Sequence, residues 1–249
     1  MIKVAVCGAY GKMGREVCQA VEQDPSMKLV AKIDLQGSNC KTIEEARSST
    51  EIDVLIDFTQ PKSIYDNAKY CIKNGIKIVV GTTGLKDDEI EYLKKISYDY
   101  KTGCLIAPNF STGAVLMMMF SKMAAKYFDN AEIIELHHNQ KKDAPSGTAI
   151  KTALMMSQVK ETFQKGNCAE TETIQGARGG GSYSDIRIHS VRMPGYIASQ
   201  EVIFGSSGQI FKIRHDSMDR KCYMDGVLMA VKHVVDKNDF VYGLENIMA

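Results

Sequence analysis

An apolar run meets a glycine-rich turn in the stretch Ile2-Lys3-Val4-Ala5-Val6-Cys7-Gly8-Ala9-Tyr10-Gly11-Lys12-Met13-Gly14. The apolar part predicts a buried strand, and the pattern from Arg15 to Glu22 predicts a helix directly after the turn. The glycines stand three residues apart throughout, unlike the usual G-x-G-x-x-G of dinucleotide-binding turns. Glycines still let backbone N–H groups approach a pyrophosphate closely, and the following helix points its positive end at the anion. Alone, such a turn is equally compatible with a plain structural role.

A carboxylate at the end of the next apolar run strengthens the ligand-binding interpretation. The run Leu29–Ile33 ends at Asp34, twenty residues beyond Gly14. An acid at the end of the second strand is where a ribose-binding carboxylate is found in dinucleotide-binding folds. The alternative is a solvated carboxylate at a strand end. Together, the turn and the acid predict a dinucleotide site.

Three later segments repeat the arrangement of a strand followed by a turn. They are Val54–Ile56 with Asp57-Phe58-Thr59, Ile76–Val80 with Gly81-Thr82-Thr83-Gly84, and a run that closes in Leu105–Phe110. Helices are predicted between the strands, over Thr42–Arg47, Pro61–Asn74 and Asp87–Ser97. Short strands alternating with helices predict an α/β fold with a doubly wound parallel sheet. Its turns would lie at the carboxyl edge, where such folds bind ligands, although each is also compatible with a plain turn.

The pattern changes at Ser111. The segment from Gly113 to Ala125 has almost no polar face, which predicts a buried helix whose methionines fill the core. The segment Ala131–His138 alternates like a strand and places Glu135 and His137 on one face, with His138 on the other.

The densest polar cluster of the chain follows this strand, from Asn139 to Ala149. The two histidines and Lys141 can supply proton donors near neutral pH. The segment Pro145–Thr148 at a helix start offers N–H groups and a hydroxyl to a carboxylate or phosphate. Each histidine is also compatible with a structural role. A metal site is disfavoured, because no Cys or carboxylate stands at helical ligand spacing.

The polar cluster resembles a long and specific family signature. Its residues, Glu135-Leu136-His137-His138-Asn139-Gln140-Lys141-Lys142-Asp143-Ala144-Pro145-Ser146-Gly147-Thr148-Ala149, match the pattern E-x-H-H-x-x-K-x-D-A-P-S-G-T-A of the 4-hydroxy-tetrahydrodipicolinate reductases, formerly called dihydrodipicolinate reductases. The turn Gly8–Gly14 is similar to that family's G-x-x-G-[RK]-M-G loop. Further resemblances, which together cover the whole chain, are Asp57-Phe58-Thr59, Gly81–Gly84, Asn109-Phe110-Ser111, His189-Ser190-Val191-Arg192 and Gly195.

The resemblance implies a two-domain enzyme. One domain would be a Rossmann-like, doubly wound parallel sheet that binds the cofactor. The other would be an α+β substrate domain whose open mixed sheet builds a homotetramer. The implied reaction is the NADH- or NADPH-dependent reduction of a cyclic dicarboxylate, 4-hydroxy-tetrahydrodipicolinate, to tetrahydrodipicolinate in the diaminopimelate route to lysine. A proton must accompany the hydride, and a cationic Lys or His within reach can give it.

The resemblance also implies roles for individual residues. His137 matches the family's proton donor and acceptor, and Lys141 matches its proton donor. His138, Gly147 and Thr148 match the substrate contacts. The cofactor contacts implied in the same way are Gly8, Ala9, Tyr10, Gly11, Lys12, Met13, Asp34, Gly81, Thr82, Thr83, Ala107, Pro108, Asn109 and Phe110.

A domain boundary is expected near Asn109. Residues 1–108 and 217–249 would form the dinucleotide-binding domain, and residues 109–216 the substrate-binding and oligomerisation domain. A long mobile loop is predicted over Gly166–Gly181 and a helix over Ser217–Val235, which the resemblance returns to the cofactor domain. Strands with one exposed face are predicted over Ile186–Val191, Gln200–Phe204 and Gln209–Ile213. For Arg192, Arg214 and Arg220, steering of carboxylates and surface solvation stay open as alternatives.

Charge and cysteine usage narrow the range of partners. The 249 residues hold 31 Lys and Arg against 30 Asp and Glu, which argues against a general nucleic-acid binder. The 7 cysteines are scattered without a C-x-x-C pair, which indicates reduced thiols rather than a zinc site or a disulfide framework. The longest apolar run, Gly113–Phe120, is too short to span a bilayer. We therefore expect a cytoplasmic protein with neither a nucleic-acid nor a membrane partner.

The residues after Asp34 predict which cofactor is preferred. They are Leu35-Gln36-Gly37-Ser38, and no basic residue follows until Lys41. Because a basic residue in this region accommodates the 2′-phosphate of NADP, the sequence predicts a preference for NADH, unless Lys12 or Lys32 reaches across.

Two rival functions are a different nicotinamide reductase on the same fold, such as an amino-acid dehydrogenase, and a non-catalytic dinucleotide sensor. The signature over Asp143–Ala149 argues against the first. Intact His137 and Lys141 argue against the second, because a sensor could have lost them freely.

Overall fold

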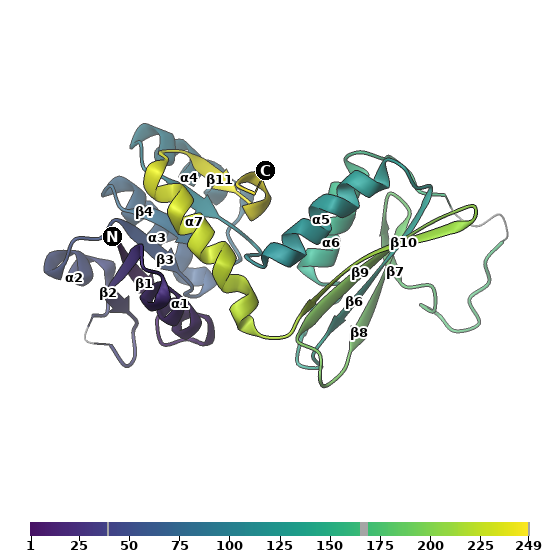
Figure 1. Cartoon of the computed structure of the whole chain (residues 1–249), viewed down its shortest axis with the longest axis horizontal. Helices are drawn as coiled ribbons and strands as arrows, with labels where there is room; N and C mark the ends of the chain where they lie inside the picture. Colours follow the sequence, from purple (N-terminus) through teal and green to yellow (C-terminus); the bar gives the residue numbers. More distant parts are fainter. Residues whose placement is uncertain (39, 165–168, 249) are drawn as a thin grey trace. The chain divides into compact units, whose positions relative to one another are not determined.

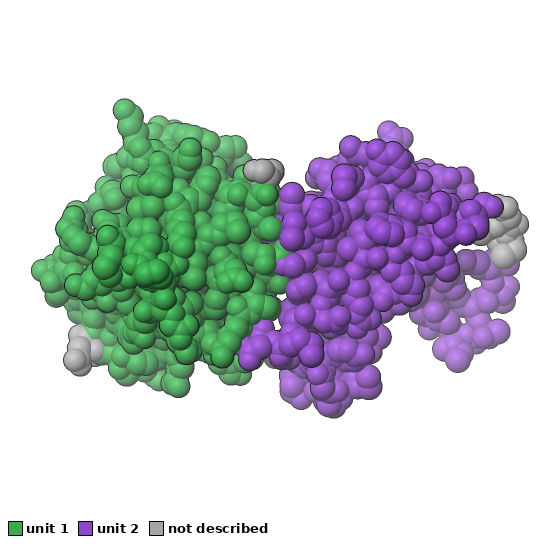
Figure 2. Space-filling view, in the orientation of Figure 1, with its two compact units in different colours: residues 1–112, 220–249 green, residues 113–219 purple. Residues whose placement is uncertain are grey.

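The computed structural model describes residues 1–38, 40–164 and 169–248. The chain folds into two compact units, unit 1 formed by residues 1–112 and 220–249 and unit 2 by residues 113–219 (Figures 1 and 2). The boundaries expected from sequence fall within four residues of these bounds. Among the described residues, no helix is both long and apolar enough to cross a membrane.

Unit 1 is built on a parallel sheet of six strands. The strands are β1 (Ile2–Cys7), β2 (Met27–Ile33), β3 (Val54–Asp57), β4 (Lys77–Val80), β5 (Cys104–Ile106) and β11 (Phe240–Tyr242), in the order β11-β5-β4-β3-β1-β2. Cys7 lies opposite both Ile33 and Asp57, and Val80 lies opposite both Asp57 and Ile106. The carboxyl ends of β1 to β5 therefore meet at one edge of the sheet. The chain runs from β1 to β2 on one side of β1 and then returns to β3 on its other side. The direction of the connections reverses here, and such a point is the usual ligand-binding crevice of these folds.

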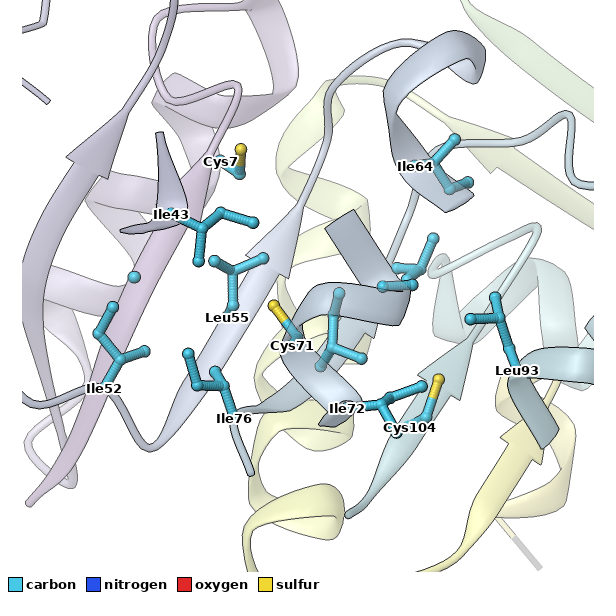
Figure 3. Packing of buried hydrophobic residues seen from close by; sticks show 14 of the residues in the cluster. Cys7, Ile43, Ile52, Leu55, Ile64, Cys71, Ile72, Ile76, Leu93 and Cys104 are labelled. Atoms are coloured by element: carbon cyan, nitrogen blue, oxygen red, sulfur yellow. The ribbon is translucent and has the colours of Figure 1, made fainter. Parts of the chain in front are cut away.

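Helices cover both faces of this sheet (Figure 1). They are α1 (Lys12–Gln23), α2 (Ile43–Ser49), α3 (Pro61–Lys73), α4 (Asp87–Asp99) and α7 (Met224–Asp236). On one face, Ile43 of α2, Ile72 of α3 and Leu93 of α4 pack against sheet residues such as Leu55 and Cys104 (Figure 3). Helices α1 and α7 contact each other, and α7 also contacts β3, β4 and β5. The predicted doubly wound α/β architecture is confirmed.

The C-terminal part of the chain differs from the prediction. The helix expected over Ser217–Val235 starts only at Met224, because β10 (Gln209–Ser217) continues to Ser217 and a 3-10 turn (Arg220–Tyr223) follows. Ser217 pairs with Ala198 in the second sheet, and this long-range pairing leaves no mark on helical periodicity. Strand β11 was not predicted. Its three residues are too few to show a period, and their strand conformation depends on pairing with β5.

Unit 2 is a mixed sheet with two helices on one face (Figure 1). Its strands are β6 (Asn130–His137), β7 (Gly180–Tyr183), β8 (Ile186–Arg192), β9 (Ala198–Ser206) and β10, in the order β10-β9-β6-β8-β7. Strand β6 runs parallel to β8, and the other pairs are antiparallel. Helices α5 (Thr112–Ala125) and α6 (Gly147–Ser157) bury Ala125, Ala153 and Met156 against Ile133 and Phe204. The predicted α+β unit with a mixed sheet is confirmed.

Helix α5 is not buried on all sides, which corrects the prediction. Met117 and Met118 are buried, whereas Leu116 and Phe120 are exposed and Met123 is 56% exposed. The helix forms the outer layer of a two-layer unit, so only one side of it meets the sheet. An apolar composition alone does not reveal this.

The loop predicted over Gly166–Gly181 lies partly outside the described residues. In its described part, the carboxylate of Glu172 accepts hydrogen bonds from the N–H groups of Gly176 (2.7 Å) and Arg178 (3.2 Å). The Arg178 side chain pairs with Glu132 of β6 at 2.7 Å. The described part of this loop is therefore connected to the sheet of unit 2 through the ion pair of Arg178 with Glu132.

Candidate active site

Backbone atoms pack closely against the Cα atoms of two glycines in the turn, Gly8 and Gly14. Gly8 has φ +77, and a Cβ at this position would stand 2.5 Å from the carbonyl oxygen of Phe58. A Cβ on Gly14 would stand 2.0 Å from the carbonyl oxygen of Gly8. Neither space admits a side chain, because real Cβ atoms do not approach an oxygen so closely. The turn therefore depends on glycine at both positions.

Helix α1 begins at Lys12, three residues earlier than predicted, so Lys12 and Met13 form its first turn. The N–H groups of a first helical turn have no partner inside the helix. Among the described residues, no side chain caps this helix at Gly11. The turn therefore presents donors and a positive helix end to an anion.

Asp34 directly follows β2 and is bonded to the glycine turn. Its Oδ2 accepts a hydrogen bond from the N–H of Tyr10 (3.0 Å), and its Oδ1 accepts one from the N–H of Gln36 (3.3 Å). Of the nearby cations, Lys32 is paired with Glu22 at 2.9 Å. The hydrogen bond from Tyr10 thus connects Asp34 to the glycine turn, two features that the sequence related only by their spacing.

A cavity of about 520 Å³ lies at this edge of the sheet. It is lined from the glycine turn, from the residues after β2 and from the residues after β3. The lining residues include Gly8, Tyr10, Gly11, Asp34, Leu35, Lys41, Phe58, Thr59, Ser63 and Asn67. The cavity has the position and the polar groups that a dinucleotide requires.

The remaining predicted cofactor residues follow β4 and β5. Thr82 donates its hydroxyl to the carbonyl of Thr59 at 3.3 Å, which joins the turn after β4 to the turn after β3. Asn109 accepts the N–H of Ser111 at 2.8 Å. The ring of Phe110 is buried, with its centroid 6.0 Å from that of Phe58. Phe110 therefore packs against Phe58 and supports the turn after β3. The others follow the same two strands: Gly81 and Thr83 after β4, Ala107 and Pro108 after β5.

In unit 2, a buried carboxylate organises the predicted polar cluster. Glu135 on β6 is fully buried, and its Oε2 lies 2.5 Å from Nδ1 of His137. Arg192 of β8 binds both carboxylate oxygens, with NH1 2.9 Å from Oε2 and NH2 2.8 Å from Oε1. Oε1 also accepts the N–H of Ser146 at 3.2 Å. One carboxylate thus joins two strands and the start of α6.

These contacts keep Glu135 ionised. Burial alone would raise the pKa of its carboxyl group, but hydrogen bonds from His137, Arg192 and Ser190 outweigh burial and lower the pKa to about 2. A neutral carboxylic acid is therefore not present at this position near neutral pH.

Lys141 lies in the loop that follows β6. Its Nζ is 2.8 Å from both oxygens of Asp143, and this hydrogen bond lowers the pKa of the Asp143 carboxyl group. His138 is exposed beyond the end of β6, and its Nδ1 accepts the N–H of Gln140 at 3.2 Å. The two histidines thus have different environments, His137 on a buried carboxylate and His138 on a surface turn.

The start of α6 matches only part of the predicted anion site. Ser146 is buried, and its hydroxyl caps the helix by accepting the N–H of Ala149 at 3.2 Å. With its own N–H bonded to Glu135, Ser146 is engaged inside the protein. Its N–H is therefore not among the donors that the start of α6 offers to an anion. Gly147 is exposed, with open space where a Cβ would stand, and Thr148 follows it in the first turn.

Sequence reasoning missed the roles of Glu135, Asp143 and Arg192 as partners of the predicted donors. The strand alternation that placed Glu135 beside His137 was the available signal, since that face of β6 also carries buried Ala131 and Ile133. No such signal joined Arg192 to Glu135, because the two are 57 residues apart.

The other two arginines lie elsewhere. Arg214 pairs with Asp216 at 2.8 Å and with Glu201 at 3.3 Å, and Arg220 is exposed. Within the described ranges, no group of three or more His, Cys, Asp or Glu side chains could hold a metal ion.

Two family models match the chain and together span nearly all of it. The model "Dihydrodipicolinate reductase, N-terminus" matches residues 2–110, and "Dihydrodipicolinate reductase, C-terminus" matches residues 113–248. The change from one model to the other falls where the chain first passes from unit 1 to unit 2, and the C-terminal model continues into the part of unit 1 that begins at Arg220.

Individual proteins agree with the family models. The 4-hydroxy-tetrahydrodipicolinate reductase of Streptococcus pneumoniae is 49% identical over 254 residues, covering 99% of each chain. That of Synechocystis sp. is 47% identical over 270 residues, covering 100% of this chain and 98% of the relative. A solved structure of dipicolinate-bound dihydrodipicolinate reductase from Paenisporosarcina sp. has a TM-score of 0.92 at 42% identity, covering 99% of each chain.

More distant solved structures share the fold alone. A myo-inositol dehydrogenase from Corynebacterium glutamicum has a TM-score of 0.62 at 12% identity.

Proposed function

Because the chain belongs to the dihydrodipicolinate reductase family, we propose that His137 and Lys141 supply the proton in the reaction of this family. The reaction is the NAD(P)H-dependent reduction of 4-hydroxy-tetrahydrodipicolinate to tetrahydrodipicolinate in the biosynthesis of diaminopimelate and lysine. The observation that supports these roles best is the buried Glu135 carboxylate, which holds His137 in place within the family signature.

Residues of unit 1 hold the cofactor in this proposal. The N–H groups of Lys12 and Met13 in the first turn of α1 bind the pyrophosphate, because those of Gly8, Ala9, Tyr10 and Gly11 are bonded inside unit 1 and shape the turn around it. The carboxylate of Asp34 accepts hydrogen bonds from a ribose. The turns after β4 and β5, with Gly81, Thr82, Thr83 and the segment Ala107–Phe110, line the cofactor further along the sheet edge. Bound NAD(P)H supplies the hydride. The donors and the cavity described above fit such a molecule.

Residues of unit 2 bind the dicarboxylate and protonate it. Gly147 and Thr148 at the start of α6 present N–H groups to one carboxylate, and His138 contributes a further polar contact. The ammonium group of Lys141 forms an ion pair with the carboxylate of Asp143. A carboxylate of the substrate can take the place of Asp143 in this ion pair. The 4-hydroxyl group leaves the ring as water, together with a ring proton, and this elimination gives the conjugated imine that accepts the hydride. The ring that has received a hydride is electron-rich, so it takes up a proton from Lys141 or His137.

A coupled assay tests the function directly. The purified protein, mixed with dihydrodipicolinate synthase and its substrates, should oxidise NADH or NADPH, followed by nicotinamide absorbance. Oxidation should stop when the synthase is left out. Turnover of amino-acid or 2-oxo-acid substrates in place of the ring dicarboxylate would instead favour a different nicotinamide reductase.

We further propose that NADH is preferred over NADPH. The exposed Leu35 follows Asp34 at the cavity, where a 2′-phosphate would meet a carboxylate. The ion pair with Glu22 occupies Lys32, which leaves Lys41 as the cation that lines the same cavity. A phosphate beside Asp34 has no cation in the residues directly after that carboxylate, which costs on the order of 1–3 kcal/mol, and Lys41 offsets only part of this cost.

That cost predicts a kcat/KM for NADH higher than for NADPH by about 5- to 150-fold, measured at low salt. Leu35→Arg should narrow or reverse the ratio, because a guanidinium beside Asp34 can bind the phosphate. Lys41→Ala should lower the remaining activity with NADPH and leave that with NADH nearly unchanged. Equal values for the two cofactors in the unmodified protein would contradict the proposal.

The proposal also includes a homotetramer in the cytoplasm, assembled through the sheet of unit 2. The face of this sheet opposite the helices carries the half-buried side chains of Glu132, Arg187 and His189, and the edge strand β10 exposes Ile210 and Phe211. Light scattering after gel filtration should give about four times the chain mass of 27.6 kDa.

A further inference from the structure

We infer that Glu135 is a positioning residue that keeps a proton on Nδ1 of His137, so that Nε2 is the nitrogen that gives the proton to the substrate. The inference rests on the proposed role of His137 as a proton donor. It adds which ring nitrogen reacts, and which buried group decides this.

The hydrogen-bond partners of Glu135 leave one arrangement of protons. An ionised carboxylate can only accept hydrogen bonds, and arginine can only donate them. Because Oε2 lies 2.5 Å from Nδ1 of His137, that nitrogen must carry the hydrogen. The neutral ring is therefore the Nδ1–H form with a lone pair on Nε2, and the charged ring carries its second proton on Nε2.

The proton balance of the step follows from this arrangement. The Nε2–H bond of the charged ring breaks, and its electron pair stays on Nε2. The proton forms a new bond to the electron-rich ring atom of the substrate that hydride delivery leaves. The imidazole ends neutral, with its Nδ1 proton still bonded to Glu135.

Glu135→Gln should invert the tautomer rather than merely weaken the contact. Oε1 accepts from two groups that can only donate, the N–H of Ser146 and the NH2 of Arg192. Oε2 accepts from only one such group, NH1 of Arg192, besides His137. We therefore expect the amide oxygen at the place of Oε1 and the amide NH₂ beside Nδ1 of His137, at the cost of the contact with NH1 of Arg192. Nδ1 then accepts a hydrogen bond, and the neutral ring carries its proton on Nε2. In the charged ring, the Nδ1–H would point at the hydrogens of the amide NH₂, and this contact between two donors disfavours the charged form.

Nitrogen-15 NMR of the imidazole rings reads the tautomer without any substrate. The chain has 5 histidines, so the signals of His137 can be assigned by their loss in His137→Gln. At a pH where the ring is neutral, the unmodified protein should show a pyrrole-type Nδ1 and a pyridine-type Nε2. Glu135→Gln should show the reverse. Its kcat should fall by roughly 10²-fold or more, with a much smaller change in the KM for the dicarboxylate.

A matched control stands three residues earlier on the same strand. Glu132 also holds a histidine and an arginine, His189 at 2.7 Å and Arg178 at 2.7 Å. Glu132→Gln removes the same charge from a similar set of partners but should leave the tautomer of His137 unchanged. Its kcat should also stay nearly unchanged when light scattering gives the same mass as for the unmodified protein, since Glu132 lies on the sheet face proposed for assembly.

Two results would overturn the inference. One is a pyridine-type Nδ1 on His137 in the unmodified protein, which decides the matter even if Glu135→Gln fails to fold. The other is a kcat for folded Glu135→Gln equal to that of Glu132→Gln. Absence of turnover by the unmodified protein would contradict the proposed function instead, and the NMR spectrum would still decide the tautomer.

Discussion

Lys141→Ala is expected to lower kcat by about 10²–10⁴-fold, the usual contribution of a positioned proton donor. The substitution removes the ammonium group that Asp143 holds at 2.8 Å in the loop after β6. Binding of NADH, measured by fluorescence titration, should change little, because the cavity beside the glycine turn is formed by other residues. Steady-state rates with the ring dicarboxylate measure the effect.

Lys142→Ala is the matched control. Lys142 is the next residue and is exposed, so its removal changes the net charge of the loop by the same amount. We expect its kcat to stay close to that of the unmodified protein. Equal losses in both variants would show that general attraction of a dianion, rather than proton donation by Lys141, explains the effect.

Gly14→Ala is expected to weaken NADH binding by at least about 10-fold, which corresponds to roughly 1.4 kcal/mol. Its Cβ would stand 2.0 Å from the carbonyl oxygen of Gly8 and 2.8 Å from Cα of Ala9. The contacts are with backbone, so the turn itself must move, and overpacking of this kind typically costs about 1–3 kcal/mol in stability. Calorimetric titration with NADH and thermal unfolding measure the two effects.

Gly11→Ala provides a graded comparison inside the same turn. A Cβ at Gly11 meets only the carbonyl oxygen of Gly8, at 3.2 Å, so a shift of a few tenths of an ångström suffices. Its effect on the dissociation constant and on Tm should be clearly smaller than that of Gly14→Ala. The reverse order would mean that the close approach at Gly14 does not control the shape of the turn.

The fold of unit 1 could be predicted because its signals are local. Strands β1 to β5 are short apolar runs that end in turns, and glycine or proline marks the ends of several helices. What could not be predicted depends on pairing between distant segments. Strand β11 exists because Phe240–Tyr242 lie beside Cys104–Ile106, and the sheet keeps Ser217 extended opposite Ala198, which delays α7.

The site divides in the same way. The residue types and their order, from the glycine turn to His137, Lys141 and Gly147-Thr148, are written in the sequence and carry the family resemblance, which the comparisons confirm. The hydrogen-bond partners of these residues cannot be inferred from the sequence. Asp34 meets the N–H of Tyr10 only because β1 and β2 lie side by side in register.

The sequence by itself determined the alternation of strands and helices, the glycine spacing and the chemistry-bearing residues, because these depend on neighbours along the chain. Only the tertiary structure decided that Glu135 is buried between His137, Arg192 and the start of α6, because β6 and β8 are brought together by sheet pairing across 57 residues. A carboxylate in that position must be paired to be tolerated, and its partners fix which protons the neighbouring imidazole can hold. Sequence spacing carries no information about such a pairing, since it depends on which strands become neighbours.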